Sequence, residues 1–187
     1  MIEDMFTWAE LGHKAANGSI AAGCNKDRLR SGHTLNQARF HIPTMREGFD
    51  AWANFTKAHP NLAPSSGQLW EVFGTQGVKA HPSESTAYAN REHVEILQLV
   101  SLDYDDPTIS DVVNNYARDW VDRYRQTSGY DKWYVYQNYA FDDEPLEAIY
   151  GYEPWRLQRL RKLKRRYDPE NVFKGYHSFV EEGRYDF

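Results

Sequence analysis

The pattern of apolar and polar positions is clearest after Asp105-Asp106-Pro107, where it has the period of an amphipathic helix. The apolar residues of this stretch form one continuous stripe along such a helix: Ile109, Val112, Val113, Tyr116, Trp120 and Tyr124. Ser128-Gly129 ends the pattern, so we expect a helix over residues 107–126 that buries this stripe.

Two more helices are predicted in the N-terminal half of the chain. Thr44 is suited to be an N-cap because Glu47 follows three residues later, which is the capping-box spacing. That helix is expected to run to Ala58, and His59-Pro60 ends it. A looser helical spacing predicts a shorter helix over residues 6–16.

Strands are predicted where apolar residues alternate or where β-branched and aromatic residues cluster. The three longest predicted strands are residues 68–73, 93–104 and 134–139. Shorter strands are predicted at residues 19–22, 38–42 and 77–81, and the polar stretch 25–36 is predicted to be a loop.

Helices and strands interleave along the chain without a regular strand–helix–strand repeat. That order favours an α+β fold, in which an antiparallel β-sheet carries helices packed on one face and is followed by a C-terminal helix and turn. The sheet is expected to contain strands 68–73, 94–102 and 134–139. Helices 44–58 and 107–126 are expected on the same face of it, since each has one apolar stripe to bury.

The C-terminal helix is predicted to begin at Pro154, whose missing N–H is not needed in the first turn of a helix. Leucines then follow at helical spacing up to Tyr167, namely Leu157, Leu160 and Leu163. Asp168-Pro169 ends the helix, because the residue before a proline is pushed out of the helical conformation.

Four short motifs follow one another in this C-terminal region. They are Tyr136-Gln137-Asn138-Tyr139, Tyr150-Gly151, Arg156-Leu157 with Lys162 or Lys164, and Asp168-Pro169-Glu170-Asn171-Val172-Phe173. In this order they resemble the C-terminal signature of the berberine-bridge-enzyme-like, FAD-linked oxidases, which reads Y-x-N-Y, Y-G, R-L with K, and D-P-x-N-x-F. Residues 82–91 resemble a second pattern of that family, P-x-x-x-T-A-Y/F-x-H-R, with Asn90 where His is usual.

The resemblance implies a division of the chain into two parts. Residues 1–133 would form a substrate-binding-type α+β domain, and residues 134–187 the berberine-bridge C-terminal segment. The family's FAD-binding half lies N-terminal to this region, and the chain contains no G-x-G-x-x-G motif. We therefore expect the C-terminal part of such an oxidase, lacking the N-terminal FAD-binding domain and holding FAD only weakly by itself.

The same resemblance assigns roles to individual residues. Tyr139 is the expected catalytic base, because the second Tyr of Y-x-N-Y faces the flavin in the family. Asn138 and Gln137 are expected to bind the cofactor at its edge. The residues expected to line the substrate cavity are Tyr136, Glu71 and Trp70. By residue type alone, the three aromatic side chains also suit core packing, and Gln137 suits hydrogen bonding within the protein.

The resemblance implies an FAD-linked oxidoreductase of the secondary-metabolite type. Such an enzyme oxidises a small organic substrate with flavin and passes the electrons to oxygen, which yields hydrogen peroxide. The alternative is a flavin-free binding or scaffold module, or an inactive truncated fragment, that complements a separate FAD domain or self-associates. The sequence leaves the identity of the substrate open.

Composition narrows the possible partners. The net charge of −5 argues against general nucleic-acid binding, so the basic residues between Arg156 and Arg166 are expected to form a solvated helix face. Cys24 is the single cysteine and the histidines are scattered, so no disulfide and no metal site are expected. The chain has neither an apolar run of membrane-spanning length nor the pattern of a signal peptide, although family members are often secreted. Localisation and the use of the sequons at Asn17 and Asn54 are therefore left open.

Overall fold

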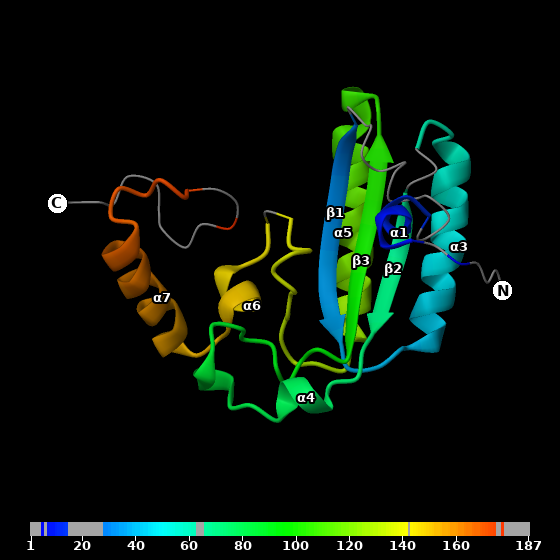
Figure 1. Ribbon diagram of the computed structural model, residues 1–187. Coiled ribbons are helices and arrows are strands. Elements are labelled where there is room, and N and C mark those ends of the chain that lie inside the picture. Colours follow the sequence, from blue (N-terminus) through cyan, green and yellow to red (C-terminus); the bar gives the residue numbers. More distant parts are fainter. Residues whose placement is uncertain are drawn as a thin grey trace.

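A three-stranded antiparallel sheet forms the centre of the fold (Figure 1). The structure is a computed structural model that describes residues 5, 7–14, 28–62, 66–141, 143–174 and 177. The strands are β1 (Leu29–Gln37), β2 (Gly67–Val72) and β3 (Ile96–Tyr104), in the order β1-β3-β2. β2 and β3 confirm the strands predicted at residues 68–73 and 94–102. β1 and β2 each pair antiparallel with the central strand β3, as expected for an antiparallel sheet.

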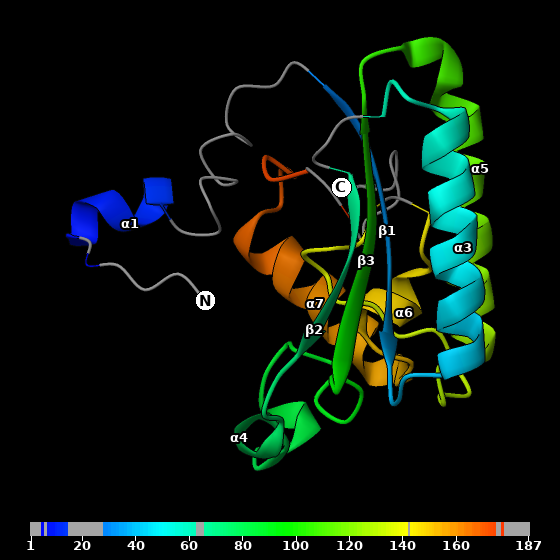
Figure 2. The same ribbon diagram turned by 90° about the vertical axis from the view of Figure 1, so that its right-hand side faces the viewer.

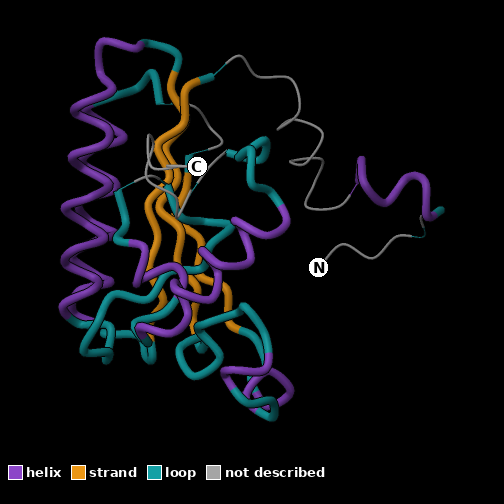
Figure 3. Tube along the Cα trace, turned by 90° about the vertical axis from the view of Figure 1, so that its left-hand side faces the viewer, coloured by secondary structure: helices purple, strands orange, loops and turns teal. Residues whose placement is uncertain are grey.

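Two long helices, α3 (Ile42–Ala58) and α5 (Ser110–Gln126), pack on the same face of this sheet, which confirms their predicted arrangement (Figures 2 and 3). Gly48 of α3 lets the two helices approach closely, because a Cβ atom there would collide with the phenol of Tyr124 on α5. The buried core between the helices and the sheet consists mainly of Leu35, Val100, Leu102, Val113, Ala117, Trp120, Val121 and Tyr124.

The two helix starts differ from each other in how well the sequence predicted them. A short 3-10 turn, η3 (Pro107–Ile109), leads into α5, and the Asp106 side chain caps it by accepting from the Thr108 N–H at 2.8 Å. The predicted N-cap of α3 is wrong, because α3 begins earlier and His41 is its N-cap. His41 Nδ1 lies 2.8 Å from Thr44 Oγ1, so Thr44 lies within the first turn.

The predicted loop at residues 25–36 and strand at residues 38–42 are wrong over the described residues, since β1 occupies Leu29–Gln37. β1 is polar in sequence yet almost wholly buried, and several of its polar side chains find partners inside the protein. Thr34 Oγ1 donates to the Gln98 carbonyl at 2.5 Å, and Asn36 Nδ2 donates to the His93 carbonyl at 2.6 Å. The strand predicted at residues 19–22 lies outside the described residues.

Residues 134–139 do not form the predicted strand. The hydrogen bonds of this segment go to different elements, because Asn36 of β1 donates to the Tyr134 carbonyl, whereas the Val135 N–H donates to Ala148. No ladder can form with partners divided in this way. The chain then turns, and the N–H groups of Tyr139 and Ala140 both donate to the Tyr136 carbonyl, at 2.9 and 3.1 Å.

The remaining elements are short except for the C-terminal helix. Helix α1 (Trp8–Lys14) lies within the predicted range 6–16, whereas residues predicted as a strand at 77–81 form helix α4 (Gln76–Lys79) instead. η2 (Ser83–Ser85) is a 3-10 turn. α6 (Leu146–Tyr150) is followed by α7 (Pro154–Tyr167), which confirms the predicted C-terminal helix with Pro154 in its first turn. Val135, Ala140, Ala148, Ile149, Tyr150 and Leu157 form a second buried cluster beneath α6 and α7.

Candidate functional site

Side chains along β2 alternate between the two faces of the sheet. Gln68 and Trp70 point to the face covered by helices, where Gln68 accepts a hydrogen bond from the Tyr124 hydroxyl at 3.0 Å. The Trp70 ring packs edge-on against Tyr124, with centroids 6.3 Å apart. Trp70, predicted to line the substrate cavity, therefore lies in the core, and Glu71 projects from the opposite face, away from α3 and α5.

Glu71 is bonded there to Tyr139, the predicted catalytic base. The Tyr139 hydroxyl donates a hydrogen bond to Glu71 Oε2 at 2.6 Å, which joins the turn at residues 136–140 to β2. Burial, and then the hydrogen bond to the nearby carboxylate, raise the pKa of Tyr139 to about 12. Tyr139 is therefore a protonated phenol at neutral pH, and its O–H donates to the carboxylate of Glu71.

The rest of the turn brings two more of the predicted residues beside this pair. Asn138 Nδ2 donates to the Tyr136 hydroxyl at 2.8 Å, and the Tyr136 and Tyr139 rings meet edge to face with centroids 5.2 Å apart. Asn138 is exposed, whereas both rings are partly buried. The turn thus presents an amide and two phenols on one small surface.

Gln137 lies in the same turn, but its amide is bonded inside the chain. Gln137 Nε2 donates to the Tyr150 hydroxyl at 3.2 Å, and that hydroxyl donates to the His177 carbonyl at 2.8 Å. His177 Nε2 lies 3.1 Å from the Ala140 carbonyl, at the end of the turn. These contacts hold the turn against Tyr150 and His177.

Asn90 also positions the turn, although the sequence assigned it no role. Its side chain is 2% exposed, and its Nδ2 donates to the Val135 carbonyl at 2.6 Å, one residue before the turn begins. The signal that could have found it is its place in the P-x-x-x-T-A-Y/F-x-H-R pattern, where a polar side chain of similar reach is usual.

Arg156 ties α7 to the same region and corrects the expectation of a fully solvated basic helix face, since it is 2% exposed. Its guanidinium donates to Glu153 at 2.9 Å, to the Ser83 carbonyl at 3.0 Å and to the Thr86 carbonyl at 3.4 Å. It also lies over the Trp155 ring, 4.6 Å from the centroid. Five donors in a planar fork suit such a convergence of acceptors.

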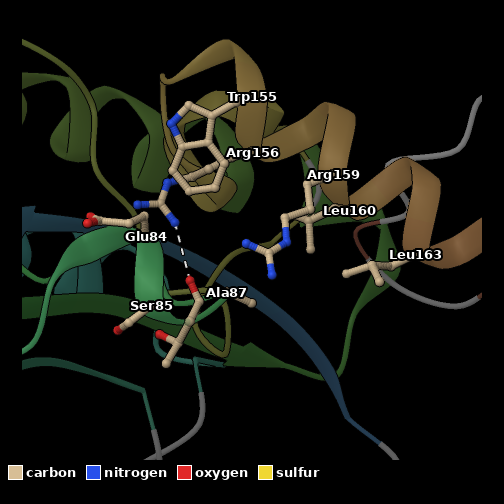
Figure 4. Close-up of a pocket in the computed structure, with 9 residues that line it drawn as sticks. Glu84, Ser85, Ala87, Trp155, Arg156, Arg159, Leu160 and Leu163 are labelled. Carbon is tan, nitrogen blue, oxygen red and sulfur yellow. Dashed lines mark hydrogen bonds between the residues drawn. The ribbon is translucent and has the colours of Figure 1, made fainter.

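Figure 4 shows the small cavity beside Arg156, between α7 and residues 84–87 at the end of η2. Its volume is about 100 Å³, and Leu160 and Leu163 of α7 form its apolar side. The dashed hydrogen bond in Figure 4 joins Arg156 to the chain at Thr86. Neither Tyr139 nor Glu71 lines this cavity.

Comparison with known proteins adds to this geometry. Residues 135–178 match the model of the family described as "Berberine and berberine like". The chain is 33% identical over 175 residues to the FAD-linked oxidoreductase anuG of Penicillium roqueforti, covering 91% of this chain and 33% of the relative. It is 35% identical over 172 residues to the FAD-linked oxidoreductase fogF of Aspergillus ruber, covering 89% of this chain and 33% of the relative.

The chain matches the C-terminal part of the berberine-bridge-enzyme-like FAD-linked oxidoreductases. It spans about a third of the length of the curated relatives that it matches. The crystal structure of aclacinomycin oxidoreductase shares the fold, with a TM-score of 0.50 and 19% identity over 79% of this chain and 31% of that one. The resemblance found in the C-terminal motifs is thus confirmed, and the relatives support FAD as the family's cofactor.

The described part of the chain shows neither of two other kinds of site. It contains no cluster of three or more His, Cys, Asp or Glu side chains arranged to hold a metal ion. Among the helices described, none is both long and apolar enough to cross a membrane.

Proposed function

We propose that this chain supplies the substrate-facing part of an FAD-linked oxidoreductase, in which Tyr139 and Glu71 together remove a proton from a substrate hydroxyl. The observation that carries the proposal is the hydrogen bond of 2.6 Å from the Tyr139 phenol to Glu71. It lies on the face of the sheet opposite α3 and α5, where a small molecule can reach the phenol because Tyr139 is only partly buried.

Tyr139 alone would be a poor base, because its pKa is high, and Glu71 is needed to take up its proton. With its pKa raised to about 12, only about one Tyr139 in 10⁵ would be ionised at pH 7, too few for a direct base. Glu71 removes this difficulty, since the phenol oxygen can accept the substrate proton while its own proton passes to the carboxylate. Tyr139 is then the group in contact with substrate, and Glu71 is the final proton acceptor.

The exposed edge of the turn fits the ring system of a flavin better than its phosphates. Asn138 offers an exposed amide for hydrogen bonds to a polar ring edge, and Tyr136 offers an aromatic surface held in place by that amide. Gln137, by contrast, is already bonded to Tyr150. When bound, FAD would supply the hydride acceptor, and these residues would orient substrate and ring and hold the proton.

The substrate proposed for this site is a small organic molecule with an oxidisable hydroxyl, and oxygen is the proposed electron acceptor. We also propose the division at residue 133, in which the segment 134–187 carries the turn and docks onto an FAD-binding region. Exposed Tyr167, Val172 and Phe173 at the end of α7 support such a docking surface. The same exposure supports the alternative function, a module that complements a separate FAD domain without holding flavin itself.

The test combines this chain with the FAD-binding portion of a relative such as anuG. Substrate-dependent loss of the visible flavin band would then be followed in the absence of oxygen. Tyr139→Phe and Glu71→Gln should each slow the loss by about 10²- to 10⁴-fold, the usual contribution of a positioned acid or base. Tyr116→Phe, at a phenol on α5 whose hydroxyl has no hydrogen-bond partner in the described structure, is the matched control. An unchanged rate in Tyr139→Phe would overturn the proposed role.

The chain alone allows two simpler measurements. Ultraviolet titrations of the native chain and of Tyr139→Phe should differ by one tyrosine that ionises near pH 12, and Glu71→Gln should lower the pKa of that tyrosine because the carboxylate charge is removed. Calorimetric titration with FAD should show only weak binding to the lone chain, and a sub-micromolar affinity would contradict that expectation.

A further inference from the structure

A second, larger cavity of about 430 Å³ lies where residues 89–93 and 132–134 meet the connection into α7. Its volume falls in the usual range of small-molecule sites, roughly 300 to 1,000 Å³. Neither Tyr139 nor Glu71 lines it, so it is separate from the site proposed above. Its lining is dominated by four ring side chains: His93, Tyr134, Tyr152 and Trp155.

The rings are held in place before any ligand arrives. His93 and Tyr134 stack with centroids 3.6 Å apart and planes 8° from parallel, and Tyr152 meets Tyr134 nearly edge-on at 5.6 Å. The Tyr152 hydroxyl is anchored by donating to the Trp133 carbonyl at 2.8 Å. Flat, pre-arranged walls of this kind favour a flat ligand, because little side-chain freedom is lost on binding.

The charges around the cavity are already engaged within the chain. Glu153 pairs with Arg156 at 2.9 Å, and the Lys132 ammonium lies 4.8 Å from the centroid of the Tyr152 ring. A charged ligand would therefore have to compete with contacts that already exist. A neutral ligand meets no such cost.

Three of the four rings carry polar atoms that make no hydrogen bond within the described part of the chain: the His93 nitrogens, the Tyr134 hydroxyl and the Trp155 indole N–H. Of these, the neutral imidazole of His93 is the strongest acceptor for a hydroxyl. Burial lowers the pKa of His93, so the ring is neutral at pH 7 and has one N–H donor and one acceptor lone pair. That lone pair can accept from a hydroxyl on a ligand.

We propose that this cavity binds a neutral, planar aromatic molecule whose hydroxyl hydrogen-bonds to the imidazole of His93. It is a second ligand site on the chain, chemically suited to phenols. It lies directly before the turn that carries Tyr139, because Tyr134 forms one of its walls.

The probe for the test is 2-naphthol, and its comparison molecules are naphthalene and 2-naphthoate. Binding to the full chain would be measured by ligand fluorescence, and the site located by shifts of backbone amide resonances. We expect 2-naphthol to bind about five- to tenfold more tightly than naphthalene, the usual size of one hydrogen bond. 2-Naphthoate should bind more weakly than 2-naphthol because it brings a charge. The resonance shifts should fall on residues 89–93, 132–134 and 151–155.

Two variants separate the ring from its polar atoms. His93→Phe keeps a ring against Tyr134 but removes the acceptor, so 2-naphthol should lose its advantage while naphthalene still binds. His93→Gln keeps an acceptor but loses the ring, so both ligands should weaken together. His81→Gln, at an exposed histidine, is the control and should change neither affinity. The proposal is overturned if naphthalene or 2-naphthoate binds the native chain as tightly as 2-naphthol, if His93→Phe preserves the ratio, or if the shifts map elsewhere.

Discussion

Asn90 and Val135 form a buried hydrogen bond in which the Asn90 side-chain amide donates to the Val135 carbonyl at 2.6 Å. The residues are 45 positions apart, so this contact brings the segment after η2 to the start of the Tyr139 turn. Val135 has no strand partner on that side, which makes the Asn90 amide the group that satisfies its carbonyl. The Val135 carbonyl thus accepts from a side-chain amide, whereas in a sheet it would accept from a backbone N–H of the neighbouring strand.

Asn90→Ala should destabilise the fold by about 1 to 3 kcal/mol, because a buried carbonyl would lose its donor. Asn90→His, which restores the residue usual in the family pattern, should recover part of the loss if the imidazole donates to the same carbonyl. Chemical denaturation measures both. Asn61→Ala, at an exposed position, is the control and should lie within about 0.5 kcal/mol of the native chain. Equal losses at Asn61 and Asn90 would contradict the assigned role.

Arg156→Lys should also destabilise the fold, although the charge is kept. A lysine cannot reach Glu153 and the Ser83 and Thr86 carbonyls at once, so buried acceptors are left without donors. We expect a loss of about 2 kcal/mol, mostly from those carbonyls, because Glu153 itself is about half exposed and stays hydrated. The matched change Arg159→Lys, on the exposed side of α7, should cost little. Thermal unfolding of the two variants side by side decides the question.

The long helices and the two hydrophobic strands could be predicted because their apolar positions repeat with a clear period. β1 could not, since its buried face is built from polar residues such as Thr34 and Asn36 whose partners are set by tertiary contacts. Residues 134–139 have the composition of a strand but divide their hydrogen bonds between β1 and α6. Composition alone does not show where a backbone finds its partners.

The candidate site was predictable only in part, for the same reason. The Y-x-N-Y motif identified the turn with Tyr136, Asn138 and Tyr139. Glu71 is predicted to line the substrate cavity, but its bond to Tyr139 spans 68 positions and follows from no local pattern. Trp70 is adjacent to Glu71 and was grouped with it, yet the alternation of a strand sends it to the opposite face.

The buried position of His33 leads us to expect that the free energy of unfolding depends on pH. It is buried on β1 with Nε2 unpaired in the described structure, between Asp143 at 3.5 Å and the charge of Arg118. Burial first, and then Arg118, lower the pKa of His33 below 6.5 against the opposing effect of Asp143. Below about pH 6.5 the unfolded chain therefore binds a proton that the folded chain does not, so the stability present above that pH is lost as the pH falls.

The expected result is a free energy of unfolding that declines between about pH 7 and pH 5, with a shallower decline in His33→Gln. His81→Gln is the control, since that side chain is exposed, and its profile should follow the native one. Denaturation at a series of pH values gives the slopes. A native profile no steeper than that of His33→Gln would show that the buried imidazole does not govern this range.

Exposed apolar residues at the end of α7 lead us to expect that the chain self-associates in solution. Tyr167, Val172 and Phe173 are 71%, 68% and 82% exposed, and all three lie at or just after the end of α7. The turn after α7 is held firmly, because Asp168 accepts from the N–H groups of Val172 and Phe173 at 2.8 and 3.1 Å, while Lys164 donates to the Phe173 carbonyl at 2.6 Å. A fixed apolar surface loses little entropy when it is covered, so association through it is favoured.

We therefore expect the lone chain to self-associate, and the double change Val172→Lys with Phe173→Lys to shift it towards monomer. Sedimentation at several concentrations measures the association, and a dye that binds apolar surfaces should lose signal in the same variant. Phe49→Lys removes an equally exposed ring from α3 and should leave both measurements unchanged. A native chain that stays monomeric at high concentration without binding the dye would count against this surface, as would an equal effect of Phe49→Lys.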